Sequence, residues 1–194
     1  IMAAALPPGT GTMAAILGLE GEVLEKVLTE ARGLGVVEPA TLNCPGQVVV
    51  AGEAAAVAAA GRLALAAGAS RVVPLAVSGP FHSSLMRGAA EEFARELAKA
   101  DLRPARIPVV ANVTAGPVTD PEEIRRLLVA QVYSPVRWEE SVRYMLAAGV
   151  EAFLELGPGR VLAGLIRRIS RETKPIGLGD ETGRKEALAF LGEV

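Results

Sequence analysis

The first part of the chain alternates short apolar runs with stretches in which apolar residues recur every three or four positions. The runs have strand length and the periodic stretches have helical spacing. The pattern predicts strands at 12–19, 36–44, 47–53 and 71–77 and helices at 20–35 and 54–70. Pro45-Gly46 separates the second and third strands, as expected of a type II turn. The order β-α-β-β-α-β predicts a ferredoxin-like subdomain at 9–77.

The second part of the chain, residues 78–194, alternates strands with amphipathic helices. Helices are predicted at 84–100, 120–132, 134–150, 160–170 and 183–194, and strands at 107–114, 152–159 and 174–180. Asp120 and Pro121 provide an N-cap and a first helical residue. Such alternation predicts a largely parallel sheet with helices on both faces, in which 107–114 is a buried strand.

Three strands are few for such a sheet, so we expect further strands before residue 1. The opening residues 1–8 resemble the end of a helix that Pro7 and Pro8 terminate, and the chain does not begin with Met. We therefore expect the sequence to be part of a longer protein.

Composition narrows the function classes. Apolar residues make up 51% of the chain, but charged residues interrupt every apolar run before membrane-spanning length, so we expect a soluble protein without a membrane partner. A net charge of −2 and 4% aromatic residues argue against nucleic-acid binding. One cysteine excludes an intramolecular disulfide, and no signal peptide is visible, so we expect a cytoplasmic location.

Most of the glycine-rich and metal-ligand motifs are explained better by local structure than by ligand binding. The glycines of "GTGTMA" at 9–14 precede a strand, whereas a dinucleotide fingerprint must follow one. "ELGPGRVLAGL" at 155–165 does follow a strand, but Pro158 removes an amide that could bind phosphate, so a tight turn is favoured. One His and one Cys without metal-ligand spacing predict no metal site.

His82 is the only histidine in the chain, and it lies between a predicted strand and a predicted helix. Open α/β sheets bind ligands at the carboxyl ends of their strands. A helix N-terminus disfavours a cationic ring, so we expect a neutral imidazole that could act as a general base. Cys44 offers a thiol nucleophile as one alternative, although a residue beside a hairpin turn is more simply a small packed side chain.

Several segments resemble the malonyl-CoA:acyl carrier protein transacylase family. They occur in the family's order along essentially all 194 residues, and they read "PPGTGTMAAILGLE", "NCPGQVVVAGE", "PLAVSGPFHSSLM", "IPVVANVTAGPV", "QVYSPVRWEESVRYM" and "LELGPGRVLAGL". The resemblance implies an α/β fold, in which an α/β-hydrolase-like acyltransferase core carries an inserted ferredoxin-like (βαββαβ) subdomain. The resemblance divides the chain into three parts. Residues 1–8 form the end of a core helix, residues 9–77 form the inserted subdomain, and residues 78–194 form the C-terminal part of the core.

The resemblance also implies a reaction. A serine takes malonyl from malonyl-CoA as an ester and passes it to the phosphopantetheine thiol of acyl carrier protein, in fatty-acid synthesis and without a cofactor. His82 matches the family's catalytic histidine, and Gln131 matches the residue whose backbone carbonyl orients that ring. Asn43 and Gln47 match a loop that faces the cleft, and Phe81 matches a bulky residue associated with malonyl specificity. A cytoplasmic monomer is implied as well.

Some family features do not occur in the sequence. It contains no G-H-S-x-G elbow for the nucleophile, no arginine in the setting that binds the malonyl carboxylate, and no glutamine loop for the oxyanion hole. We expect all three to lie before residue 1, and the 194-residue chain alone to be inactive. An acyltransferase of a polyketide pathway, a thiol enzyme and a non-catalytic interaction module remain as alternatives.

Overall fold

The computed structural model describes residue 7 and residues 9–192, so the predicted helix end at 1–8 lies almost entirely outside the described residues. The chain divides into two units, Ile1–Ser141 and Val142–Val194. The boundary falls within helix α5 (Trp138–Ala147).

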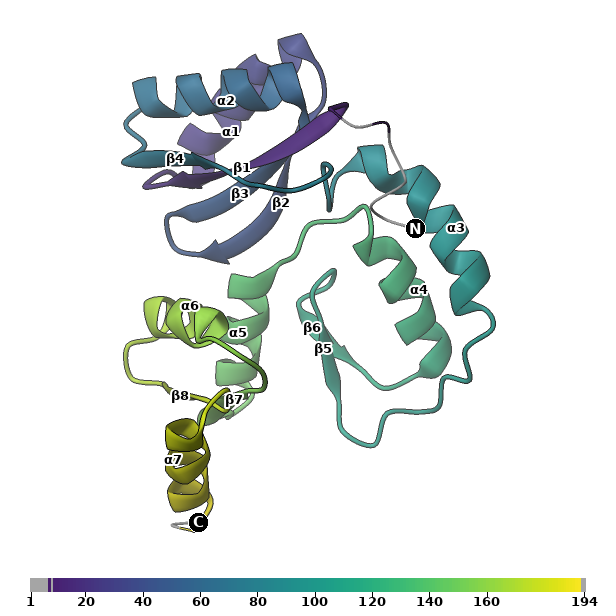
Figure 1. Ribbon diagram of the computed structural model, residues 1–194, viewed down its shortest axis with the longest axis vertical. Coiled ribbons are helices and arrows are strands. Elements are labelled where there is room, and N and C mark those ends of the chain that lie inside the picture. Colours follow the sequence, from purple (N-terminus) through teal and green to yellow (C-terminus); the bar gives the residue numbers. More distant parts are fainter. Residues whose placement is uncertain (1–6, 8, 193–194) are drawn as a thin grey trace. The chain divides into compact units, whose positions relative to one another are not determined.

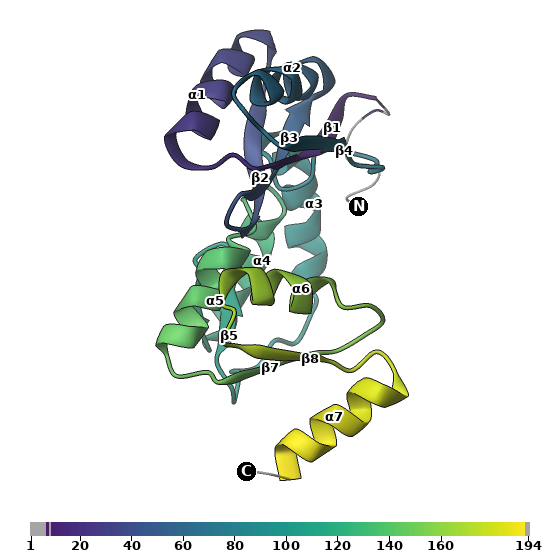
Figure 2. The same ribbon diagram turned by 90° about the vertical axis from the view of Figure 1, so that its left-hand side faces the viewer.

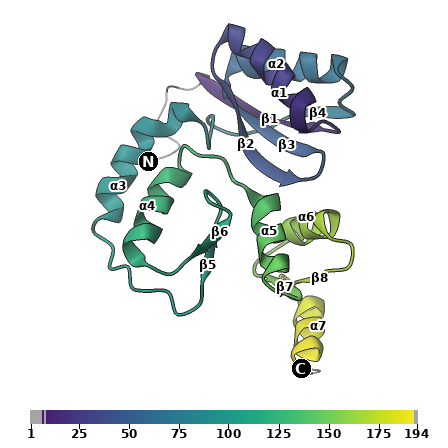
Figure 3. The same ribbon diagram turned by 180° about the vertical axis from the view of Figure 1, so that it is seen from behind.

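The first unit begins with a four-stranded antiparallel sheet. Its strands are β1 (Gly11–Leu17), β2 (Val37–Cys44), β3 (Gln47–Glu53) and β4 (Arg71–Pro74), in the order β2-β3-β1-β4. Helices α1 (Gly21–Ala31) and α2 (Ala54–Ala66) cover one face of this sheet, and a short helix, η2 (Arg32–Leu34), follows α1 (Figures 1 and 3). The predicted βαββαβ order is confirmed.

A hydrophobic core lies between the sheet and these two helices. Alternate residues of the strands point into it, such as Ala14 and Ile16 of β1 and Val48 and Val50 of β3. The helices contribute side chains at helical spacing, including the fully buried Leu28. This pattern of alternating and helical periods is the one from which the subdomain was predicted.

Two glycines fit this sheet for steric reasons. Gly46 in the β2–β3 turn has a φ of 69°, which favours glycine. Gly52 of β3 lies so close to the start of β2 that a Cβ atom would be 2.0 Å from the carbonyl oxygen of Val36, the residue just before that strand. The backbones of β2 and β3 therefore approach each other at a distance that only glycine allows.

The rest of the first unit combines helices, loops and a short hairpin. It contains the short helix η3 (Ser84–Met86), α3 (Arg87–Leu97) and α4 (Pro121–Gln131). Helices α3 and α4 lie side by side (Figure 1), and Met86, Ala89, Ala90 and Val132 form a small buried cluster near them. Asp120 caps α4 by accepting a hydrogen bond from the Glu123 amide at 2.8 Å, which confirms the predicted helix start.

The predicted buried strand at 107–114 is wrong in length, burial and pairing. Only β5 (Val109–Ala111) is extended, and it pairs antiparallel with β6 (Gly116–Val118). The chain reverses between them because the amides of Thr114 and Ala115 both bond the Ala111 carbonyl, with Ala115 at a φ of 52°. Val109 is 49% exposed, so one end of this hairpin is open to solvent.

The segment between α4 and α5 connects to the sheet of the same unit. The Leu42 amide donates to the Val136 carbonyl, and the Val136 amide donates to the Ala40 carbonyl, each at 2.9 Å. Strand β2 is therefore bonded on one side to β3 and on the other to the residues that follow α4.

The second unit contains the end of α5 and a parallel strand pair. Strands β7 (Ala152–Glu155) and β8 (Lys174–Gly177) are parallel, and α6 (Val161–Ile169) connects them. Helix α7 (Glu181–Gly192) follows β8, and α6 and α7 lie on opposite sides of the pair (Figure 2). This pair meets the expectation of parallel strands, whereas β5–β6 does not.

The "ELGPG" stretch of this unit is a turn with a capped helix behind it. Glu155 accepts hydrogen bonds from the Leu162 and Ala163 amides at 3.0 and 2.8 Å, so its carboxylate occupies the N-terminus of α6. A phosphate would need those same amides, which agrees with the predicted tight turn.

Candidate active site

His82 lies in the connection that leads from β4 to η3, and its backbone is strained. Its φ of 62° is in the left-handed region, which non-glycine residues rarely occupy. The next residue, Ser83, is 0% exposed, and its hydroxyl donates to the Pro80 carbonyl at 2.6 Å. Because the surrounding contacts fix this turn, the position of the ring is also restricted.

The connection is seated against the first strand of the sheet. The ring of Pro80 packs on Gly11 so closely that a Cβ atom at Gly11 would lie 2.5 Å from Pro80 Cγ. The absence of a side chain at Gly11 thus allows the residues before His82 to lie on β1. The sequence does not suggest this contact, since the two residues are far apart in the chain.

The imidazole of His82 is held by a backbone carbonyl. Its Nδ1 lies 2.9 Å from the carbonyl oxygen of Gln131, and both residues are half-buried. A carbonyl oxygen only accepts, so Nδ1 carries the proton. In the neutral ring Nε2 then has a free lone pair, as a general base requires.

The side chain of Gln131 has a different partner. Its Nε2 donates to the Ser134 carbonyl at 2.9 Å and lies 3.5 Å from His82 Nδ1. Two donors do not bond each other, and the shorter distance identifies the Gln131 carbonyl as the acceptor for Nδ1. The resemblance assigns this role to the backbone of Gln131, and the contact has that geometry.

The carbonyl of Gln131 is available because it stands at the end of a helix. Helix α4 ends at Gln131, and the last carbonyls of a helix lack intrahelical partners. Next to it, the guanidinium of Arg87 lies 4.4 Å from the centre of the Tyr133 ring. This cation–π contact joins the start of α3 to the turn that follows α4.

The other predicted site residues lie in two further places. Phe81 is partly buried and packs against two clusters, one of them on β1 to β3 and the other near α3 and α4. Asn43 and Gln47 lie near the tip of the β2–β3 hairpin, where the Cys44 thiol donates to Gln47 Oε1 at 3.8 Å. The structure thus brings His82 to Gln131, and Asn43 to Gln47.

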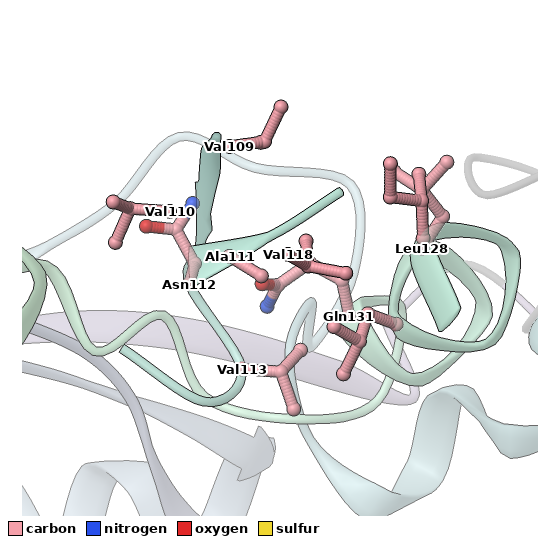
Figure 4. A pocket seen from close by; sticks show the side chains of 10 residues that line it. Val109, Val110, Ala111, Asn112, Val113, Val118, Leu128 and Gln131 are labelled. Carbon is pink, nitrogen blue, oxygen red and sulfur yellow. The ribbon is translucent and has the colours of Figure 1, made fainter. Parts of the chain in front are cut away.

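A small apolar cavity adjoins the same helix end. It has a volume of about 180 Å³ and lies between the β5–β6 hairpin and α4. Figure 4 shows the lining residues of the hairpin on one side and Leu128 and Gln131 of α4 on the other. Gln131 thus contributes its carbonyl to the histidine and its side chain to the cavity wall. The sequence did not predict this cavity, because the hairpin that forms one wall was expected to be a buried strand.

Among residues 7 and 9–192, no three His, Cys, Asp or Glu side chains lie close enough to hold a metal ion. Across the same residues, no helix combines the length and apolar character that crossing a membrane requires.

A half-buried histidine–carbonyl contact within an α/β unit fits acyl transfer, and comparison with known proteins identifies the class. Residues 2–184 match the acyl transferase domain family, and the chain belongs to that family. A malonyl CoA-acyl carrier protein transacylase from Bacillus subtilis is 45% identical over 190 residues, which are 97% of this chain and 60% of that protein.

Solved structures give the same result. An acyl carrier protein S-malonyltransferase from Vibrio cholerae matches with a TM-score of 0.92 and 45% identity, over 96% of this chain and 61% of that chain. A malonyl-transacylase in complex with a type II polyketide acyl-carrier protein matches with a TM-score of 0.93 and 42% identity, over 97% and 61%. The chain therefore spans about three fifths of these relatives, and their shared fold confirms the predicted α/β acyltransferase class.

Proposed function

We propose that this chain forms part of a malonyl-CoA:acyl carrier protein transacylase in which His82 is the general base and acid. The observation that carries the proposal is the hydrogen bond from His82 Nδ1 to the Gln131 carbonyl, which leaves Nε2 free. The names of the relatives support malonyl as the acyl group and acyl carrier protein as the acceptor. The printed sequence has no G-x-S-x-G elbow, so the proposed serine lies in the part of the relatives that this chain does not span.

In the first half-reaction, Nε2 of His82 takes the proton of the serine hydroxyl while the serine oxygen attacks the thioester carbonyl of malonyl-CoA. The tetrahedral intermediate collapses and the carbon–sulfur bond breaks. Nε2 then gives its proton to the departing coenzyme A sulfur. The Gln131 carbonyl accepts from Nδ1 throughout, and therefore stabilises the imidazolium that exists between the two proton transfers.

The second half-reaction runs through the same groups in reverse. Nε2 takes the proton of the phosphopantetheine thiol, and the resulting thiolate attacks the seryl ester. The ester bond breaks, and the serine oxygen recovers its proton from His82. The only groups this scheme needs besides the protein are the two thiols and the acyl group, so we propose a reaction without a cofactor.

Three further residues have proposed roles around the substrate. Phe81 adjoins His82 in sequence, and we propose that its bulk favours malonyl over α-branched acyl groups. Asn43 and Gln47 would face the substrate from the tip of the β2–β3 hairpin. We also propose that the enzyme works in the cytoplasm. We propose that it is a monomer, and sedimentation of the complete protein would test this oligomeric state.

The acceptor has a second candidate. One matched structure is a malonyl-transacylase in complex with a type II polyketide carrier protein, so a carrier protein of that class is the alternative acceptor. Transfer rates to the two kinds of carrier protein, measured side by side, would distinguish them.

A hybrid enzyme tests the proposal. In this hybrid, the chain replaces the matching residues of the Bacillus subtilis relative, which supplies the remaining part of the family. We expect malonyl transfer from malonyl-CoA to acyl carrier protein, and a loss of at least about a thousandfold in the hybrid with His82→Ala. Thermal unfolding shows whether both hybrids fold. Equal transfer by the two folded hybrids would exclude His82 as the base.

A further inference from the structure

A carboxylate of the sheet holds the backbone next to His82. Oε2 of Glu38 accepts a hydrogen bond from the Ser84 amide at 2.7 Å, and the side chains and backbone involved are partly buried. Glu38 is on β2, so this contact joins the sheet to the turn that contains the histidine. No local sequence pattern links the two, and neither the resemblance nor the matched family assigns Glu38 a role.

The turn needs such a contact because its conformation is unfavourable. The left-handed φ of His82 is maintained only if neighbouring contacts oppose its relaxation. The structure gives one contact at each of three successive residues. The His82 ring bonds the Gln131 carbonyl, the Ser83 hydroxyl bonds the Pro80 carbonyl, and the Ser84 amide bonds Glu38.

Strand β2 supports both partners of the His82–Gln131 hydrogen bond. Through Glu38 it holds the residue two positions after His82. Through Ala40 and Leu42 it bonds Val136, which lies five positions after Gln131. One strand is thus bonded to two segments, one close in sequence to the ring and the other close in sequence to its acceptor.

We infer that Glu38 is a positioning residue for His82. Its carboxylate oxygen fixes the Ser84 amide and thereby the left-handed backbone at His82, so that Nδ1 stays on the Gln131 carbonyl and Nε2 stays free. The importance of this for catalysis rests on the proposed role of His82 in acyl transfer. The effect of Glu38 on the orientation of the His82 ring does not rest on that role, because the ring can be observed directly.

Three variants of Glu38 distinguish the effect of its acceptor oxygen from the effect of its charge. Glu38→Gln keeps an acceptor oxygen at the same reach and loses the charge, whereas Glu38→Asp keeps the charge and shortens the reach by one methylene. Glu38→Met keeps the length and has only a weak acceptor. The matched control is Glu53→Met, since Glu53 Oε2 also accepts a backbone amide, that of Val36, at 2.7 Å and in a partly buried setting.

The direct readout is the imidazole nitrogen spectrum, which is unambiguous because the chain contains one histidine. We expect the Nδ1–H tautomer in the parent and in Glu38→Gln. Glu38→Met and Glu38→Asp should instead show a larger share of the Nε2–H tautomer and faster hydrogen exchange at the Ser84 amide. The Glu53→Met control should keep the parent's histidine signals.

Kinetics of the hybrid enzyme supply the second readout. We expect kcat to fall about ten- to a hundredfold in Glu38→Met and Glu38→Asp with little change in KM, and to recover in Glu38→Gln, because a misplaced base slows the chemical step. Parent-like histidine signals in Glu38→Met, or equal tautomer changes in Glu38→Met and Glu53→Met, would overturn the inference. A changed His82 tautomer in Glu38→Met, combined with malonyl transfer by the hybrid that does not need His82, would support the inference and contradict the proposed function.

Discussion

His82 combines a strained backbone with a ring whose two nitrogens have different environments. The left-handed φ turns the side chain toward the end of α4, where an unpaired helix carbonyl accepts from Nδ1. A carboxylate in the same place would attract the imidazolium more strongly. The neutral carbonyl instead fixes the ring with less electrostatic pull, which suits the proposed reaction, in which Nε2 takes a proton and gives it to a departing thiolate.

The backbone of Gln131, rather than its side chain, should matter for catalysis. In the hybrid enzyme we expect Gln131→Ala to lower kcat less than about tenfold, because the carbonyl that holds His82 remains. The lost contact is the one from the side-chain amide to the Ser134 carbonyl. Steady-state kinetics beside His82→Ala provide the measurement. A loss in Gln131→Ala as large as that in His82→Ala would contradict this division of roles.

Phe81 should affect stability as well as substrate choice. Its ring packs between two hydrophobic clusters, so Phe81→Ala is expected to lower the free energy of unfolding by about 2 kcal/mol, less than for a fully buried ring. Urea unfolding of the chain measures this change. Phe81→Leu, which keeps apolar contact, is the control and should lose less. An unchanged unfolding midpoint in Phe81→Ala would show that the ring contributes little packing.

At the scale of elements, hydrophobic periodicity predicted the first subdomain well. The strands and helices between residues 11 and 74 follow the predicted order because each buries a regular face against one core. The β5–β6 hairpin was missed for a physical reason. Its reversal depends on Ala115 at positive φ, and alanine gives no sequence signal for that conformation.

The site was only partly predictable for a similar reason. His82 stood out as the single histidine, and its pairing with Gln131 came from family resemblance. The contacts of Gly11 with Pro80 and of Glu38 with Ser84 join residues that are distant in sequence. Periodicity describes which face of an element is buried, and it does not identify the residue that this face meets.

The close approach of β2 to β3 can be tested by substitution of the glycine that allows it. Gly52→Ala places a methyl group 2.0 Å from the Val36 carbonyl oxygen, and we expect a loss of about 2 kcal/mol or more in the free energy of unfolding. Gly88→Ala is the matched control, since Gly88 lies in α3 with open space around it. That change should stabilise the chain by about 0.5 kcal/mol through helix propensity. Equal effects of the two substitutions on chemical denaturation would contradict the described strand approach.

The whole molecule consists of two units that carry different parts of the family's fold. The first contains the sheet, the histidine and its acceptor, and the second contains the parallel strand pair. Together they span about three fifths of the length of the matched relatives. The proposed division of the chemistry follows from this, with the base on this chain and the serine outside it.

The chain without the rest of the family should therefore form no acyl-enzyme. After incubation with malonyl-CoA, intact-mass measurement is expected to find the 194-residue chain unmodified, because its sequence contains no nucleophile elbow. The hybrid enzyme, treated in the same way, should carry one malonyl group. A malonyl ester on the isolated chain would place the nucleophile among its own residues.

His82 presents a free Nε2 because the Gln131 carbonyl holds Nδ1, and the proposed chemistry depends on this arrangement. Nitrogen NMR of the imidazole tests it most directly, since the one histidine of the chain gives one pair of ring signals. Free histidine favours the Nε2–H tautomer. The structure predicts the opposite one, with the proton of the neutral ring on Nδ1 and a bare Nε2. A predominant Nε2–H tautomer would show that the Gln131 carbonyl does not accept a hydrogen bond from Nδ1 and that Nε2 is not free.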